Sequence, residues 1–248
     1  MIPTCDPESK GPESRLQPEA SVAASAASHV RELHSPDAWA THTGMTEPTL
    51  LPDGDALFRT FFYAWYDEAA RSRHPDRLRA DVEEIEFPDG AERVLSCPLS
   101  EEQRATVEQR LRDITDAAVK DLGPMFGARA PLTTAWLEAF DAHFDRAAVN
   151  RLIQTSNARD YGNSYLLVCC ETGALLARLL RQFDPALQWV PDWPYWESAL
   201  FDPATGAVIN PFHWAIRRMS EQGADDPLAA KVASCIAWLQ ERRGESKE

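Results

Sequence analysis

A cysteine and a histidine in the second half of the chain are the residues best suited to nucleophilic chemistry. A catalytic cysteine must be largely ionised, or must have a base beside it that removes its proton. If Cys170 lies in a helix, its nearest neighbours are Gly173 and Ala174, which are small and neutral, while Glu171 would raise the pKa of the thiol. The candidate base, His213, lies much further along the chain. We therefore expect Cys170 to be a structural thiol.

Six carboxylates form an acidic strip in the first half of the chain, with no lysine or arginine among them. The strip consists of Asp81, Glu83, Glu84, Glu86, Asp89 and Glu92. Such a run is typical of a solvated sheet edge, whose charge discourages pairing with other chains. It also suits a binding site for a cationic partner. The sequence leaves both interpretations open.

Other catalytic arrangements are poorly represented in the sequence. The chain has no glycine-rich phosphate loop and no His-Glu-x-x-His, Cys-x-x-Cys or Gly-x-Ser-x-Gly motif. The histidines after residue 55 are His74, His143 and His213. They are too scattered to predict a metal site, and we expect no cofactor. Glu171, Glu197 and Asp202 could supply a carboxylate pair, although a turn role accounts for Asp202 equally well.

Charge and composition bear on the class of partner. The formal net charge is −14 and the sequence pI is about 4.9. Nucleic acids and anionic membranes attract clustered Lys and Arg, so we expect neither as a partner, whereas a basic protein fits. No apolar run approaches the roughly 20 residues of a membrane-spanning helix, and no signal peptide is seen. Five cysteines without a regular spacing indicate reduced thiols and a cytoplasmic location.

The first 54 residues have the composition of a disordered tail. They contain 7 of the 18 prolines and few large apolar residues, so they cannot bury enough apolar surface to offset the entropy of ordering. Met45 is an alternative start, and Trp39 could mark a docking segment. Over 55–248 we expect a single domain, with a mainly helical part over 55–160 and a helix–hairpin–helix part over 161–248.

The first part of this domain is predicted to contain helices and one hairpin. An aromatic face predicts a helix over 55–74. Two extended runs around a Pro-Asp-Gly turn predict a hairpin over 81–95, which carries the acidic strip. A capping box at Ser100 opens a predicted helix over 101–122. One further helix is expected over 132–153.

The second part begins with a predicted helix over 164–183. One of its faces is a core stripe and the neighbouring face is made of small residues, which permits close approach of another backbone. Alternation predicts strands over 196–201 and 207–210, joined by an Asp-Pro-Ala-Thr-Gly loop. Helices are expected over 213–219 and 226–243. These helices and this hairpin must position Cys170 and His213.

The run from Pro194 to Met219 resembles a group of uncharacterised bacterial proteins that share its Asp-Pro-Ala-Thr-Gly turn and its Pro-Phe step. With the preceding helical run Gly173–Leu180 and Trp189, it is also similar to the uncharacterised DUF3806 family. The similarity covers about residues 130–240. It implies a shared fold, and it implies no reaction because that family carries no established chemistry.

The order of elements also resembles transglutaminase-like and papain-like thiol enzymes, in which a helix bearing cysteine precedes a strand bearing histidine. This resemblance places Cys170 at the nucleophile, Tyr195 at the base and Asn210 at the carboxylate position. Tyrosine cannot act as that base at neutral pH because its pKa is near 10. His213 could substitute only if the following helix folds back. The resemblance therefore implies an inactive relative.

We accordingly expect an α+β fold that is mostly helical, with a small antiparallel sheet in the C-terminal half. The preferred function is a noncatalytic, acidic, cytoplasmic binding protein, of the kind that serves as an immunity or antitoxin partner of a basic protein. The alternative is a thiol acyl-transferase or hydrolase built on Cys170, His213 and Asn210.

Overall fold

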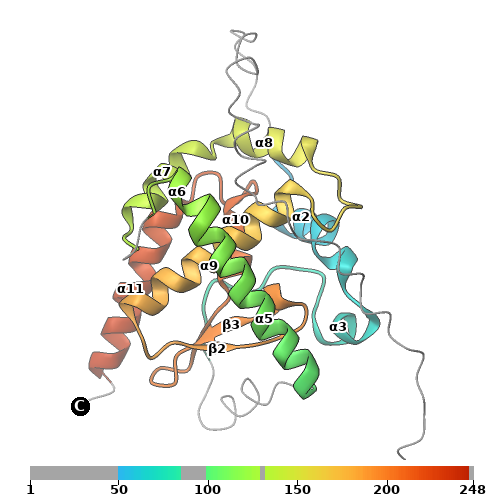
Figure 1. Ribbon diagram of the computed structural model, residues 1–248. Helices are drawn as coiled ribbons and strands as arrows, with labels where there is room; N and C mark the ends of the chain where they lie inside the picture. Colours follow the sequence, from blue (N-terminus) through green and yellow to red (C-terminus); the bar gives the residue numbers. More distant parts are fainter. Residues whose placement is uncertain (1–49, 85–98, 129–131, 246–248) are drawn as a thin grey trace, which may run out of the picture.

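The helix α9 (Ser164–Phe183) lies at the centre of the molecule (Figure 1), in a computed structural model that describes residues 50–84, 99–128 and 132–245. Its bounds match the sequence prediction. The Asn163 side chain caps it by accepting from the amide of Leu166. The helix is buried on nearly all sides, although Phe183 at its C-terminal end is 51% exposed.

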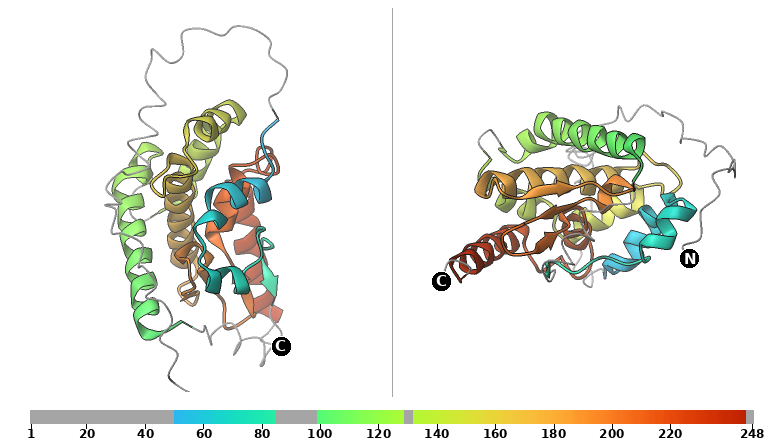
Figure 2. Two further views of the ribbon diagram at one scale, coloured as in Figure 1. Left: turned by 90° about the vertical axis from the view of Figure 1, so that its right-hand side faces the viewer. Right: turned by 90° about the horizontal axis from the view of Figure 1, so that it is seen from below.

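Two helices pack directly on α9, on different sides. Helix α5 (Glu101–Ala117) crosses one face, and α10 (Pro211–Arg218) packs along another. The views in Figure 2 show α5 on the opposite side of α9 from α2 (Gly54–Phe61) and α11 (Leu228–Glu245). A Cβ atom at Gly173 would lie 2.8 Å from the Cα atom of Phe212. The predicted small face of α9 therefore permits the close approach of α10.

Helix α5 begins with the predicted capping box, in which the Ser100 hydroxyl and the Gln103 side chain each accept from the backbone amide of the other residue. It continues into a π-helical turn, η3 (Ala118–Leu122), and a short helix, α6 (Gly123–Met125). The predicted end at residue 122 thus coincides with the change from the π-helical turn to α6.

The N-terminal part of the domain is interrupted where one helix was predicted. Helix α2 (Gly54–Phe61) is followed by η2 (Tyr63–Trp65) and α3 (Glu68–Arg73). The break occurs because Asp67 caps α3, accepting from the amide of Ala70. Before α2, residues 51–54 are anchored to residues 221–222 through backbone and side-chain hydrogen bonds. These four residues therefore belong to the packed domain rather than to the tail.

The predicted single helix over 132–153 is wrong. The chain forms α7 (Ala135–His143) and α8 (Arg146–Thr155), because Asp145 leaves the helical conformation and caps α8 through the amide of Ala148. The apolar spacing continues through the break, since Phe144 is buried beside both helices.

The last helix, α11 (Leu228–Glu245), follows Pro227 and contacts α7. Its first turn is capped from another element: both carboxylate oxygens of Asp141 accept backbone amides, from Leu228 and Ala229 at 3.1 Å each. Asp141 also pairs with the buried Arg218 of α10, with 2.7 Å between Nε and Oδ1. One carboxylate thus joins α7, α10 and α11.

Among the described residues, four short strands form one antiparallel sheet in the order β1-β4-β3-β2. The strands are β1 (Glu83–Glu84), β2 (Gln188–Val190), β3 (Ala199–Phe201) and β4 (Ala207–Ile209). The side chains of Leu200 and Ile209 join the main core, whereas Val190, Ala199, Phe201 and Val208 form a second apolar cluster. The α+β prediction is confirmed.

The strand predicted over 196–201 needs correction, and the predicted acidic hairpin is described only in part. The strand predicted over 196–201 starts only at Ala199, because residues 195–197 form the 3-10 turn η4 (Tyr195–Glu197). The loop between β3 and β4 is as predicted, with Gly206 at a φ of 75°. Of the predicted acidic hairpin, only β1 is described, and it pairs with β4; the remainder lies outside the described residues.

Candidate functional site

A buried carboxylate, Glu197 of η4, is the centre of a polar cluster that joins distant segments of the described chain. The Tyr66 hydroxyl donates to its Oε1, and Arg79 Nε donates to its Oε2 at 3.0 Å. The Nε2 atom of His213 lies 3.3 Å from the same Oε1. The side chains of Glu197 and His213 are 2% and 1% exposed, so this contact is shielded from water.

A second histidine extends the cluster towards the surface. The Nδ1 atom of His74 lies 3.6 Å from Glu197 Oε2 and 3.0 Å from Arg79 Nη2. Its Nε2 atom lies 3.4 Å from the Oδ2 of Asp192. Asp192 also lies 3.8 Å from the guanidinium of Arg73. The cluster therefore joins the end of α3, the segment after it and the segment before η4.

The hydrogen bonds of His213 identify the tautomer that fits this environment. Its Nδ1 atom accepts from the backbone amide of Arg79 at 2.9 Å. With Nδ1 acting as an acceptor, the proton of the neutral ring is on Nε2, which faces Glu197. Nδ1 is thereby hydrogen-bonded, Nε2 lies against the Glu197 carboxylate, and the imidazole connects α10 to the segment after α3.

Electrostatics favour an ionised Glu197 and a protonated Tyr66. Burial alone would raise the pKa of Glu197, but His213, Arg79 and His74 outweigh burial and lower this pKa from 4.5 to about 2. Burial and the neighbouring carboxylate raise the pKa of Tyr66 above its ordinary value. The Tyr66 oxygen also accepts from Trp196 Nε1 at 3.1 Å. At neutral pH Glu197 therefore carries a negative charge, and Tyr66 and Arg79 donate hydrogen bonds to it.

The three residues of the thiol-enzyme alternative have other roles. Cys170 is buried, and its side chain is hydrogen-bonded to that of Tyr195; burial raises the pKa of the thiol to about 12. Asn210 caps α10, accepting from the amide of His213 at 3.0 Å and donating to the carbonyl oxygens of Trp196 and Glu197. The contacts of His213 described above involve Arg79 and Glu197 rather than a thiol.

The acidic strip is only partly described. Asp81 pairs with Lys231 at 2.9 Å and lies 3.4 Å from the guanidinium of Arg217. Glu84 pairs with Arg242 at 2.6 Å. These two carboxylates therefore bind β1 and the segment before it to α10 and α11. Glu83 pairs in β1 with Val208 of β4. The remaining members, Glu86, Asp89 and Glu92, lie outside the described residues.

The carboxylates proposed as a pair have separate surroundings. Asp202 accepts from the Thr205 hydroxyl and from the amide of Ala204, and it pairs with Arg243 at 2.8 Å. This is the turn role that the sequence allowed. Glu197 is bound to Tyr66, Arg79 and the two histidines, and Glu171 is buried within α9.

The Glu197 cluster was not predicted from the sequence. Its members Tyr66, His74 and Arg79 lie more than a hundred positions before Glu197, and such distant residues meet only in the fold. One local signal exists: Glu197 lies in the stretch from Trp196 to Phe201, whose other residues apart from Ser198 are apolar. A carboxylate in such a place is expected to be buried and paired.

Comparisons with known proteins give no relative. No protein-family model matches the chain, and neither a curated protein nor a solved structure matches it. The resemblance to the DUF3806 family and to thiol enzymes therefore stays a prediction. Within the described ranges, no group of three or more His, Cys, Asp or Glu side chains is placed to hold a metal ion. No helix in the described part of the chain combines the length and apolar character that a membrane span requires.

Proposed function

We propose that this protein is a noncatalytic binding protein whose partner is a basic protein. The observation that carries the noncatalytic part is the double engagement of His213, which accepts from Arg79 on one ring nitrogen and faces Glu197 with the other. A general base needs a nitrogen that is open to the proton it removes. The alternative is thiol acyl transfer or hydrolysis by Cys170, His213 and Asn210. It lacks this support because each of these side chains makes contacts that hold elements of the fold together.

The basic partner is proposed from the net charge of −14, which favours association with cationic surfaces and raises their encounter rate. The acidic strip is the proposed contact surface. Asp81 and Glu84 already pair with cations of α10 and α11. Among the described members of the strip, the proposal therefore rests on Glu83.

The test uses two variants of equal net charge. One carries Glu83→Gln, Glu86→Gln and Glu92→Gln, and the control carries Glu102→Gln, Glu138→Gln and Glu241→Gln, which removes three exposed carboxylates elsewhere. The original chain and both variants are purified from the native host at low and at high salt, and the proteins that co-purify with each are compared. We expect a basic protein to be retained at low salt by the original chain and the control, and lost with the strip variant.

Equal retention by both variants would remove the strip from the proposal. Retention of no basic protein by the original chain at low salt would overturn the proposal of a basic partner. Turnover of an acyl substrate that disappears with Cys170→Ala would instead favour the thiol-enzyme alternative.

A further inference from the structure

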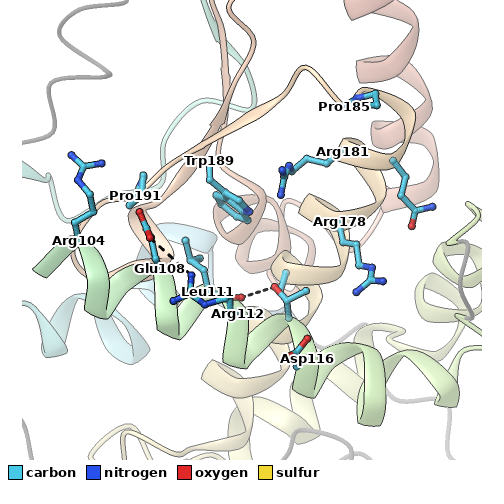
Figure 3. A pocket seen from close by; sticks show the side chains of 13 residues that line it. Arg104, Glu108, Leu111, Arg112, Asp116, Arg178, Arg181, Pro185, Trp189 and Pro191 are labelled. Carbon is cyan, nitrogen blue, oxygen red and sulfur yellow. Dashed lines mark hydrogen bonds and ion pairs between the residues drawn. The ribbon is translucent and has the colours of Figure 1, made fainter. Parts of the chain in front are cut away.

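A groove between α5, α9 and the segment that contains β2 is positively charged, in contrast to the acidic chain as a whole. Its volume is about 730 Å³, which lies in the range of pockets for small organic ligands. Figure 3 shows side chains from these three segments gathered around it. Four arginines line it: Arg104 and Arg112 from α5, and Arg178 and Arg181 from α9.

The arginines of the groove outnumber its carboxylates. Glu108 and Asp116 are the acidic lining residues, so the lining carries a formal excess of two positive charges (four minus two) within a chain of net charge −14. Arg112 is partly satisfied, since it lies 3.9 Å from Glu108 and donates to Gln109. A local positive field against an acidic background is expected to concentrate anions at this place.

Two of the four guanidinium groups stand out by their surroundings. Arg104 and Arg178 are half-buried, and no ion pair joins either of them to a carboxylate within the residues that the structure describes. They come from different helices, and Figure 3 shows them at opposite ends of the groove, with Trp189 between them. A planar guanidinium fork suits phosphate and carboxylate oxygens.

The groove also offers an aromatic surface. The indole of Trp189 is half-buried and stacks on Phe212, with ring centroids 6.0 Å apart and an angle of 25° between the planes. Trp189 lines the groove together with Leu111 and Pro191, and the side chain of Arg181 extends towards it in Figure 3. A ring held by Phe212 from behind is a preorganised platform for another flat, apolar group.

We propose that this groove binds a phosphorylated small molecule that carries a planar ring, with the ring placed against Trp189 and the phosphates held on one side of it by Arg178. A long polyanion is disfavoured, because beyond the groove it would meet the negative charge of the rest of the chain. A small ligand is confined to the positive region. This proposal is independent of the proposed protein partner.

The test is calorimetric titration at low ionic strength with three probes: ATP, inorganic tripolyphosphate and adenosine. ATP carries both features, tripolyphosphate only the charge and adenosine only the ring. We expect ATP to bind most tightly, tripolyphosphate more weakly and adenosine least, with the affinity for ATP falling as salt is raised. Failure of ATP to bind at low ionic strength would overturn the proposal.

Matched variants locate the binding. Arg178→Gln should weaken ATP binding about tenfold, in line with a lost charged hydrogen bond. Arg59→Gln and Arg159→Gln remove exposed arginines that are not part of the groove lining and should leave the affinity unchanged. An equal loss in either control variant would show general charge attraction and overturn the site.

Trp189→Leu tests the ring contact. It should weaken ATP binding about tenfold, as expected for a lost stacking contact, and leave tripolyphosphate binding unchanged. An equal loss for both probes in a variant that keeps its melting temperature would overturn the role of Trp189. Equal affinity of the original chain for ATP and tripolyphosphate would overturn the planar ring as part of the ligand class.

Discussion

The imidazole of His213 and the carboxylate of Glu197 lie 3.3 Å apart, and both are almost fully shielded from solvent. Glu197 is in η4, just before the sheet, whereas His213 is in α10, which packs on α9. A third element meets them, because Arg79 donates to Glu197 with its side chain and to His213 with its backbone amide. This contact therefore fixes where three segments meet.

Removing the charge of Glu197 should destabilise the protein. In Glu197→Gln, Arg79 loses the carboxylate that it pairs with at 3.0 Å, and among the described residues its partly buried guanidinium keeps only the longer ion pair with Asp192 at 4.0 Å. We expect a loss of about 3 kcal/mol in the free energy of unfolding, measured by urea denaturation. The control is Glu108→Gln, which breaks an exposed pair with Arg112 and should cost less than about 0.5 kcal/mol. Equal losses would contradict a special role for Glu197.

The same carboxylate should make stability depend on acidity below neutral pH. The pKa of Glu197 falls from 4.5 to about 2 in the folded chain. A carboxyl with a lowered folded pKa contributes stability that is complete above its unfolded pKa and is lost as the pH falls towards the folded value. Between pH 4.5 and 2, the original chain should lose about 3 kcal/mol through this group.

Glu197→Gln lacks the titrating group, so the gap in unfolding free energy between this variant and the original chain should close over the same interval. The measurement is urea denaturation of both proteins at a series of pH values. A gap that stays constant from pH 5 to pH 2.5 would contradict the assignment of the pKa shift to Glu197.

Cys170 should react as a buried, un-ionised thiol. Burial raises its pKa to about 12, and the thiolate is the reactive form. Modification by iodoacetamide, followed at Cys170 by peptide mass spectrometry, should be very slow in the folded chain at pH 7 and should increase on denaturation. Cys235 is a control in the same chain, because burial also raises its pKa to about 12. A fast reaction at Cys170 that levels off near pH 6–7 and disappears in His213→Ala would contradict a structural role.

Local signals in the sequence predict those features whose partners are close along the chain. The capping box of Ser100 and Gln103 and the bounds of α9 are of this kind. The break between α7 and α8 was missed, because the apolar spacing through Phe144 continues across Asp145. The Glu197 cluster and the arginine groove depend on distant segments, and no spacing rule brings such segments together.

The contribution of residues 51–54 to the stability of the domain should be revealed by a pair of truncations. A chain that begins at Leu50 keeps Leu51, which is 5% exposed, and the cap that Asp53 provides for α2. A chain that begins at Asp55 loses both, at a cost of about 2 to 4 kcal/mol from the lost burial and cap. Thermal unfolding should show the longer chain clearly more stable. Equal melting temperatures would contradict the anchoring of residues 51–54.

The close approach of α9 and α10 should make position 173 intolerant of a side chain. In Gly173→Ala the new methyl carbon would lie 2.8 Å from Phe212 Cα and 2.5 Å from its Cδ1, so α10 must move away from α9. Alanine favours helices, by about 1 kcal/mol over glycine, but overpacking against backbone typically costs about 1 to 3 kcal/mol and has to exceed that gain. We expect net destabilisation in urea. Gly162→Ala is the control, because its nearest contact would be Asp160 Oδ1 at 3.5 Å, and it should change stability little. A stabilised Gly173→Ala protein would show that α10 can shift without loss, and the packing of Phe212 on Gly173 would then not hold the two helices in place.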